Sequence, residues 1–155
     1  MIEKTEIVEQ QAFYVSGISI RTINHDGQSK KDMMALWARF MDGNILQQFK
    51  GLASEDIYCV YTDYESDYTG YYTAVLGRKV ASLTQIPEGF TAIAIPAGKY
   101  KIYNLSGKCP QNVLDGWQHI WDSGTDRKYS ADFDVYTPNV LSFDDSDVKI
   151  YLAIK

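Results

Sequence analysis

The chain has 155 residues, of which 45% are hydrophobic and 23% are charged, and this balance excludes an intrinsically disordered protein. Its formal net charge of −5 argues against direct nucleic-acid binding, because contacts to phosphates require clustered lysine and arginine. The adjacent basic pairs, which are Lys30-Lys31, Arg78-Lys79 and Arg127-Lys128, all fit solvated helix ends or turns.

The first half of the chain predicts a strand, a helical run and a hairpin, in that order. The strand is rich in β-formers, with Gly17 as the place for a bulge. Apolar residues then recur at helical spacing, and Gly43-Asn44 divides this run into a longer and a shorter helix. Two tyrosine-rich strands around a polar tip are typical of a hairpin. The predicted ranges are 12–22 for the strand, 31–49 for the helical run, and 57–64 and 70–77 for the hairpin.

The second half repeats this order after a turn at Pro87-Glu88-Gly89. Two strand segments flank a bend at Pro96-Ala97-Gly98, and an amphipathic helix then opens with Pro110 in its first turn. Two closing strands follow, separated by an acidic turn at 144–147. The predicted ranges are 90–95 and 98–104 for the first strands, 111–123 for the helix, and 131–136 and 148–154 for the closing strands.

Residue matches between the two halves indicate an internal repeat. Trp37 corresponds to Trp117, and Val60-Tyr61-Thr62 corresponds to Val135-Tyr136-Thr137. A repeat fixes the architecture, so we expect a single α+β domain over 1–155 built from a duplicated βαββ module with pseudo-two-fold symmetry. Its halves cover about 10–86 and 90–155, and two long helices pack on a mostly antiparallel sheet. Grooves between such copies favour small-molecule sites.

The cysteines and the N-terminus indicate the compartment. Cys59 lies in a strand-like run and Cys109 in a loop, and neither has the spacing of a metal ligand, so we expect no metal and no cofactor. Residues 1–6 lack the apolar stretch of a signal peptide, and no segment approaches the ~18 apolar residues of a membrane span. We therefore expect a cytoplasmic protein that does not contact a membrane.

Five motifs follow one another along nearly the whole chain. They are Val60 to Asp67 with Tyr72 and Gly77 after it, Ile95 to Tyr100, Trp117 to Trp121, Phe133 to Tyr136, and Ile150 to Lys155. In this order they resemble the GyrI-like, or AraC-type effector-binding, domain family. The resemblance implies a ligand groove between two βαββ halves, in bacterial regulators or stand-alone proteins that sense cationic, aromatic, drug-like compounds. With no DNA-binding segment fused here, we expect any transcription-regulating partner to be a separate chain.

The resemblance also implies a carboxylate in the pocket. The usual pocket acid of the family is the Glu of a Phe-Glu-x-Tyr motif, and this chain carries Asp134 at the matching place, one methylene shorter. On a strand, Asp134 and Tyr136 share one face while Phe133 and Val135 share the other. A buried carboxylate needs a partner, and a cationic ligand would supply one. The alternative is an aspartate that is solvated at a strand edge or bonded to the backbone.

Aromatic side chains complete the predicted ligand site. Trp37 and Trp117 occupy equivalent helical positions, where they either belong to the core or offer ring faces to a cation, whereas Trp121 is expected in the core. The hairpin acids Asp63, Glu65 and Asp67 form either an acidic rim or a polar tip. The predicted ligand-binding residues are Asp134, Trp117, Tyr136, Tyr61, Tyr72, Tyr151 and Trp37.

Three functions compete on this evidence. The first is a stand-alone domain that binds a small, hydrophobic, cationic ligand and acts as a sensor, through a protein partner, or as a sequestering protein. The second, implied by some members of the family, is a hydrolase of reactive cyclopropane-containing compounds with Asp134 as general base. A carboxylate does this well with a raised pKa or close placement, and the shortening from Glu to Asp weakens the case. The third is an inhibitor that acts by protein contact, as the namesake of the family does. Fold alone decides none of these.

Overall fold

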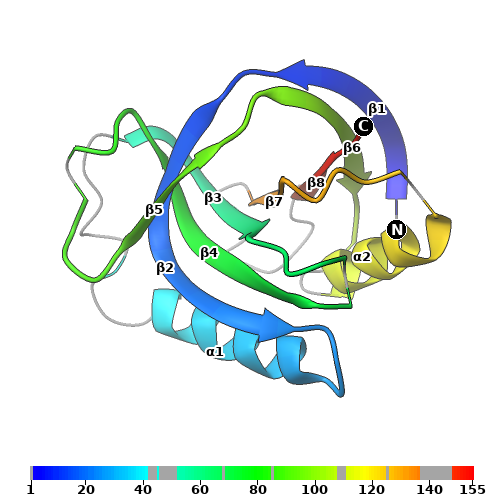
Figure 1. Cartoon of the computed structure of the whole chain (residues 1–155), viewed down its shortest axis with the longest axis horizontal. Helices are drawn as coiled ribbons and strands as arrows, with labels where there is room; N and C mark the ends of the chain where they lie inside the picture. Colours follow the sequence, from blue (N-terminus) through cyan, green and yellow to red (C-terminus); the bar gives the residue numbers. More distant parts are fainter. Residues whose placement is uncertain are drawn as a thin grey trace.

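In the part of the chain that the structure describes, eight strands form one antiparallel sheet with two helices against it (Figure 1). The structure is a computed structural model, and it describes residues 2–41, 45, 52–67, 69–84, 86–107, 111–124, 126–136 and 148–155. The strands are β1 (Ile2–Gln10), β2 (Phe13–Ile23), β3 (Leu52–Thr62), β4 (Tyr71–Val80), β5 (Thr91–Ile95), β6 (Gly98–Leu105), β7 (Ala131–Tyr136) and β8 (Val148–Ala153). The helices are α1 (Gln28–Met41) and α2 (Gln111–Ser123).

The strands follow the order β1-β6-β8-β7-β3-β4-β2-β5 across the sheet, and every pairing is antiparallel. The α+β class and the antiparallel sheet are therefore as expected, and the predicted hairpin is the β3–β4 pair. The pairing of β3 with β7 joins the two halves of the chain at the middle of the sheet, with Cys59 opposite Asp134 and Tyr61 opposite Asp132. Duplication of a βαββ unit stays a prediction.

Gly17 shows why the predicted bulge in β2 is wrong. The β2–β4 ladder runs without a register shift from Tyr14 opposite Val80 to Ile23 opposite Tyr71. Gly17 lies opposite Gly77, and a Cβ built on Gly17 would lie 2.1 Å from the carbonyl oxygen of Leu76. The glycine is required because two backbones approach closely, not because an extra residue loops out.

The helices are shorter than the expected long pair. α1 has 14 residues and begins at Gln28, three residues before the predicted start, and α2 has 13 residues with the predicted bounds. The end of the predicted 31–49 run, Pro110, Cys109 and the turn at 144–147 lie outside the described residues. No described helix is long and apolar enough to cross a membrane.

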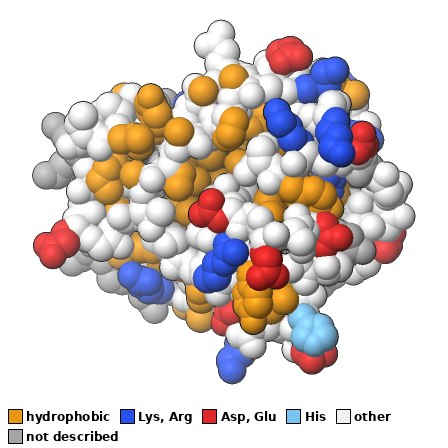
Figure 2. Space-filling view, viewed as in Figure 1, with side chains coloured by type: hydrophobic (Ala, Val, Ile, Leu, Met, Phe, Trp, Pro, Cys, Tyr) orange, Lys and Arg blue, Asp and Glu red, His pale blue; other side chains and the backbone are white. Residues whose placement is uncertain are grey.

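The edge strand β1 has no counterpart in the predicted elements, because its polar residues show no clear apolar alternation. It pairs with β6 from Ile2 opposite Leu105 to Gln10 opposite Gly98. Its side chains from residue 4 on are mostly exposed, and Ile7 has 61% of its surface accessible. Charged residues on an edge strand oppose unwanted pairing with other chains. On the face seen in Figure 2, charged side chains of both signs are likewise interspersed with apolar ones.

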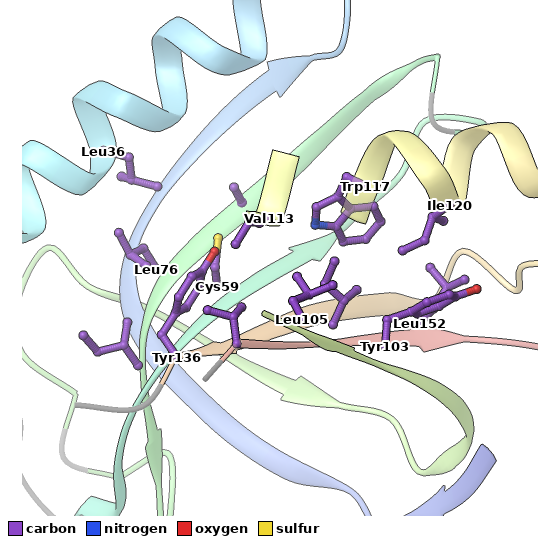
Figure 3. Packing of buried hydrophobic residues seen from close by; sticks show 14 of the residues in the cluster. Leu36, Cys59, Leu76, Tyr103, Leu105, Val113, Trp117, Ile120, Tyr136 and Leu152 are labelled. Atoms are coloured by element: carbon purple, nitrogen blue, oxygen red, sulfur yellow. The ribbon is translucent and has the colours of Figure 1, made fainter. Parts of the chain in front are cut away.

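Each face of the sheet carries its own apolar cluster. On the helix face, Leu36 and Phe40 of α1 and Trp117 and Ile120 of α2 pack with strand residues such as Leu76 (Figure 3). The opposite face buries a second cluster, whose members include Phe13, Val15, Tyr58, Val60, Val75, Ile95, Tyr100 and Phe133. Because successive strand residues point to opposite faces, the register decides which side chains reach the helices.

Gly116 brings α2 close to the sheet. A Cβ on this residue would lie 3.0 Å from the Cδ1 of Ile150 and 3.1 Å from the Cδ2 of Leu105. The absent side chain lets the helix lie directly on β6 and β8, and the next residue, Trp117, is thereby placed over the middle of the sheet.

Candidate functional site

A cavity of about 410 Å³ lies on the helix face of the sheet, bounded by α1, α2 and the strands between them. Its volume is that of a site for a drug-sized molecule. Its walls are largely aromatic and aliphatic, and all three tryptophans of the chain contribute to them. The lining residues are Asn24, Ser29, Lys30, Met33, Met34, Trp37, Ala38, Met41, Tyr61, Tyr64, Tyr72, Val113, Leu114, Trp117, Trp121, Arg127 and Tyr136.

Asp134 lies directly behind three of these aromatic rings, and its side chain is fully buried. Tyr61 Oη donates a 2.6 Å hydrogen bond to Oδ2 of Asp134, and Tyr136 Oη donates a 3.0 Å bond to the same oxygen. Trp117 Nε1 donates a 3.0 Å bond to Oδ1. The three donors all line the cavity, whereas Asp134 does not. The carboxylate is therefore separated from the cavity by the rings that bind it.

Burial raises the pKa of Asp134 to about 7, although the hydrogen bonds from Tyr61, Tyr136 and Trp117 favour the ionised form. Near neutral pH the group exists in both protonation states. A positive charge in the cavity would shift this equilibrium toward the carboxylate, since opposite charges attract strongly where water is excluded. Burial, and next the charge of Asp134, raise the pKa of Tyr61 well above its usual value, so its phenol stays a neutral donor.

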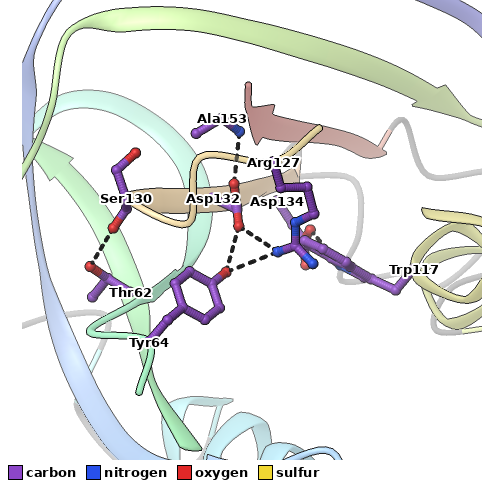
Figure 4. Close-up of polar contacts among 8 residues, drawn as sticks. All are labelled: Thr62, Tyr64, Trp117, Arg127, Ser130, Asp132, Asp134 and Ala153. Carbon is purple, nitrogen blue, oxygen red and sulfur yellow. Dashed lines mark hydrogen bonds and ion pairs between the residues drawn. The ribbon is translucent and has the colours of Figure 1, made fainter. Parts of the chain in front are cut away.

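A second buried carboxylate, Asp132, lies two residues before Asp134 on the same face of β7. Its Oδ2 accepts hydrogen bonds from Tyr64 Oη at 2.5 Å and from Arg127 Nη2 at 2.8 Å, and its Oδ1 accepts one from the backbone N–H of Ala153 at 2.7 Å (Figure 4). Burial raises the pKa of Asp132, and the charge of Arg127 opposes that rise. A hydrogen-bonded ion pair thus lies at the wall of the cavity, with Arg127 in the lining and Asp132 behind it.

Arg127 does not occupy a solvated turn, as its sequence neighbours had suggested, because it is 6% exposed and paired with Asp132. Its guanidinium carbon lies 4.2 Å from the ring centroid of Tyr129 and 5.7 Å from those of Tyr64 and Trp117. Guanidinium groups stack favourably on aromatic faces. The protein thus holds a cation of its own among aromatic rings.

Edge-to-face contacts hold the rings in place. The ring centroids of Tyr61 and Trp117 are 5.1 Å apart at 76°, and those of Trp37 and Tyr136 are 4.9 Å apart at 80°. Tyr72 lies 5.9 Å from Tyr61, and its hydroxyl donates to Asn24 Oδ1 at 3.1 Å. Such pairs prefer this geometry because the positive ring edge meets the negative ring face. The cavity is therefore largely formed before any ligand enters.

The family model described as Cass2, integron-associated effector binding protein, matches residues 6–154. The chain belongs to the Cass2 family. The expected GyrI-like effector-binding domain is confirmed by this match and by solved structures of the same fold. The chain is 28% identical over 149 residues to YobU of Bacillus subtilis (strain 168), whose name places it among transcriptional regulators. This alignment covers 90% of the chain and 91% of YobU.

Two solved structures share the Cass2 fold. One is an integron cassette protein from the mobile metagenome of Vibrio cholerae, with a TM-score of 0.80 and 26% identity; the match covers 99% of this chain and 97% of that protein. The other is SAV2435 bound to tetraphenylphosphonium, with a TM-score of 0.80 at 15% identity over 99% of this chain and 94% of that one. At that identity the likeness to SAV2435 shows the fold alone.

Five of the seven residues predicted for the ligand site line the Cass2-family cavity together: Trp37, Tyr61, Tyr72, Trp117 and Tyr136. Asp134 contacts three of them from behind. Tyr151 does not reach the cavity. It lies on the opposite face of the sheet, stacked on Phe133 with centroids 4.6 Å apart, because its neighbours Ile150 and Leu152 face the helices.

Other lining residues were not predicted. Trp121, expected in the core, is half-buried and lines the cavity, and Tyr64, Arg127 and the methionines of α1 were not singled out. Alternation along β7 is a signal for Asp132, since it shares a face with Asp134. The acids Asp63, Glu65 and Asp67 are exposed and absent from the lining, as a polar hairpin tip would be.

Proposed function

We propose that this chain is an effector-binding domain whose cavity takes up a flat, hydrophobic, aromatic compound with a positive charge. One observation carries the proposal: three rings of the cavity wall donate hydrogen bonds to a single buried carboxylate, Asp134. A donor bonded to an anion becomes more electron-rich, and this polarisation strengthens the attraction of its ring for a cation. The ligand would meet ring faces, with the charge of Asp134 acting through them.

The energetics of such a site favour apolar burial with a smaller electrostatic contribution. Removing apolar surface from water contributes about 25 cal/mol per Å². Each cation–π contact adds about 0.5–2 kcal/mol. Methionines on α1, which include Met33 and Met41, complete the wall with flexible side chains that adapt to different ligand shapes. A cavity of this kind would accept a class of compounds rather than one molecule.

The relatives support a sensing or sequestering role. Tetraphenylphosphonium, the compound in the SAV2435 structure, is an aromatic cation with no hydrogen-bonding group. YobU, which the chain matches over 91% of its length, is named as a transcriptional regulator. We therefore propose that ligand binding here is read by a separate regulatory chain or serves to sequester the compound. A cytoplasmic location fits this role.

The geometry favours binding over hydrolysis. A general base must reach a water molecule next to the substrate. Asp134 is fully buried, already accepts three hydrogen bonds, and is shielded from the cavity by the rings of Tyr61, Trp117 and Tyr136. Asp132 is likewise buried and paired with Arg127. In the described part of the chain, the cavity lining contains no Asp or Glu.

We also infer that the two halves are copies of one unit, with the cavity at their junction. The order β2-α1-β3-β4 corresponds to β6-α2-β7-β8. Counted outward from the β3–β7 pair, the strands are β3, β4 and β2 on one side and β7, β8 and β6 on the other. Tyr61 of β3 and Tyr136 of β7 both line the cavity. A ligand would thus contact equivalent residues from both halves.

Two ions of nearly the same shape and opposite charge test the proposal. Because all three tryptophans line the cavity, intrinsic fluorescence reports its occupancy. We expect saturable quenching by tetraphenylphosphonium and at least about tenfold weaker binding of tetraphenylborate, which corresponds to about 1.4 kcal/mol. Equal affinity for the two ions would contradict a charge-selective site, and no saturable response to either would contradict the binding function itself.

A further inference from the structure

A second hollow, of about 190 Å³, lies on the face of the sheet opposite the helices. It is smaller than a site for a drug-sized molecule, and its volume suits a single substituted aromatic ring. It shares no described lining residue with the cavity between the helices. Among the residues that the structure describes, its lining combines four aromatic rings with two lysines and one aspartate. This chemistry differs from that of the larger cavity and points to a different ligand.

Aromatic rings form the floor of this hollow. The ring of Phe133 stacks on that of Tyr151, with centroids 4.6 Å apart at 15°, and meets Phe13 edge-to-face at 5.2 Å and 79°. The ring of Tyr58 lies 5.9 Å from Phe133. These contacts hold the rings in place before any ligand binds. A flat aromatic ligand would extend the same packing.

The hydroxyl of Tyr58 is an unused donor at this hollow. Tyr58 is 9% exposed, and its Oη has no hydrogen-bond partner in the described part of the chain. The fully buried side-chain atoms without a partner do not include this Oη, so the hydroxyl is accessible from the hollow that Tyr58 lines. Burial, and next the charge of Asp56, raise the pKa of Tyr58 to about 12, so the phenol stays protonated and can donate to an acceptor.

Two lysines bring positive charge to the same hollow. Lys79 Nζ lies 5.1 Å from the ring centroid of Phe13, and Lys149 is exposed on β8 opposite Val135. Neither lysine forms an ion pair within the described residues. Asp56 is the single carboxylate of the described lining, so two lysines and one aspartate leave it a net charge of +1. The hollow therefore matches a ligand with one negative charge.

We propose that this hollow is a second binding site, which takes a small aromatic carboxylate. The ring of the ligand packs on the aromatic floor, and its carboxylate accepts a hydrogen bond from Tyr58 Oη and pairs with the ammonium groups of Lys79 and Lys149. Charge-assisted hydrogen bonds of this kind are about twice as strong as neutral ones. The inference does not rest on the function of the cavity between the helices. The domain would bind a cation on one face of the sheet and an anion on the other.

Benzoate, benzamide and benzamidinium test the inference, because they share one planar shape and are anionic, neutral and cationic. We expect benzoate to shift the amide NMR signals of Tyr58, Phe133 and Lys149 saturably, and benzamide to bind about tenfold more weakly at this face. Benzamidinium should not bind there. The indole N–H signals of the three tryptophans, all of which line the other cavity, should stay in place when benzoate is added.

Three results would overturn the inference. They are equal affinity of the three compounds at this face, no saturable shift with benzoate, and benzoate shifts confined to the tryptophan indoles. Saturation with tetraphenylphosphonium should leave the benzoate affinity within about twofold, and displacement of benzoate would likewise overturn the second site. If tetraphenylphosphonium gives no response while benzoate binds as expected, the proposed function of the larger cavity fails and the second site stands.

Variants assign the binding to the donors of the hollow. Lys79→Met keeps an apolar stem beside Phe13 but loses the ammonium, and we expect about tenfold weaker benzoate binding. Lys128→Met removes the same charge from an exposed position outside both linings and should bind benzoate as the native chain does. Tyr58→Phe loses only the hydroxyl and should weaken benzoate binding several-fold, with thermal melts to establish that each variant is folded. Unchanged affinity in Lys79→Met, or an equal loss in Lys128→Met, overturns the inference.

Discussion

Tyr61 binds Asp134 diagonally across the β3–β7 pair. The residue opposite Tyr61 is Asp132, and the residue opposite Asp134 is Cys59, yet the Tyr61 phenol reaches Oδ2 of Asp134 at 2.6 Å. Together with Tyr136 and Trp117, the ring separates the charge of Asp134 from the cavity while remaining hydrogen-bonded to it.

Replacing Asp134 by asparagine tests the role of this charge. Asparagine has nearly the same shape but cannot ionise, so we expect Asp134→Asn to weaken tetraphenylphosphonium binding about tenfold. Binding of a neutral aromatic compound of similar size should change little. Titration of intrinsic fluorescence with both compounds measures the difference, and an equal loss for both would mean that the carboxylate acts only through packing.

Cation binding should depend on pH through the same group. Because burial raises the pKa of Asp134 to about 7, the free protein carries the carboxylate mainly above that pH. Affinity for tetraphenylphosphonium, which does not titrate, should therefore rise from pH 5.5 to about 7, by at most about tenfold per pH unit, and then level off. A curve that is flat in the native chain would refute the link, and Asp134→Asn should give a flat curve as control.

Stability without ligand should show the opposite trend. The pKa of Asp134 is about 7 in the fold against an ordinary value of 3.8, so between these values the folded state binds more protons than the unfolded state. The contribution of Asp134 to the free energy of unfolding is therefore present below about pH 4 and declines as the pH rises to about 7. Urea unfolding of the native chain and of Asp134→Asn, compared at several pH values, isolates it. If the native chain instead gained stability relative to Asp134→Asn as the pH rose from 4 to 7, the pKa of Asp134 could not be raised in the fold.

Two tyrosine-to-phenylalanine changes form a matched pair. Tyr61→Phe removes one of the hydrogen bonds that favour the ionised carboxylate, so the pKa of Asp134 should rise further and cation binding at pH 7 should weaken several-fold. Tyr151→Phe loses a hydroxyl on the opposite face of the sheet and should leave ligand affinity unchanged. Isothermal titration of both variants decides, and a loss in Tyr151→Phe would place the site on the wrong face.

Trp117 is both a core residue and part of the cavity wall, two positions that its sequence pattern does not distinguish. It is 8% exposed and belongs to the helix-face cluster, yet it also lines the cavity. We expect Trp117→Ala to lower the free energy of unfolding by about 3–5 kcal/mol and also to weaken ligand binding. Denaturant melts and binding curves on the folded fraction separate these effects. Trp37→Ala, at a half-buried position, should destabilise less.

The sequence predicts which segments form helices and strands better than it predicts which side of the sheet each side chain faces. Helical spacing leaves Trp37 and Trp117 either in the core or in a groove, and the family resemblance is what indicates a groove lined by them and by Tyr136. All three residues line the cavity. Tyr151 lies outside this cavity because its direction depends on pairing with β7, where it lies opposite Phe133, and no local pattern fixes that register.

Arg127 could not be predicted to be buried for a related reason. Its neighbours Asp126 and Lys128 are exposed and read as a turn. Its burial depends on long-range contacts, namely a bridge to Ile154 and the ion pair with Asp132. The sequence shows the alternation that places Asp132 on the same face as Asp134. It does not show that Arg127 pairs with Asp132.

The ring shield in front of Asp134 has a consequence for selectivity among amines. A carboxylate open to the cavity would reward ligands with N–H groups, because it could accept their hydrogen bonds directly. Here the three nearest donors belong to the protein, so a primary ammonium could not donate a hydrogen bond to this carboxylate. Quaternary ammonium and phosphonium centres are surrounded by hydrocarbon groups and have no N–H donors that need an acceptor. The domain would therefore distinguish synthetic lipophilic cations from the polyamines and amino acids that fill a cell.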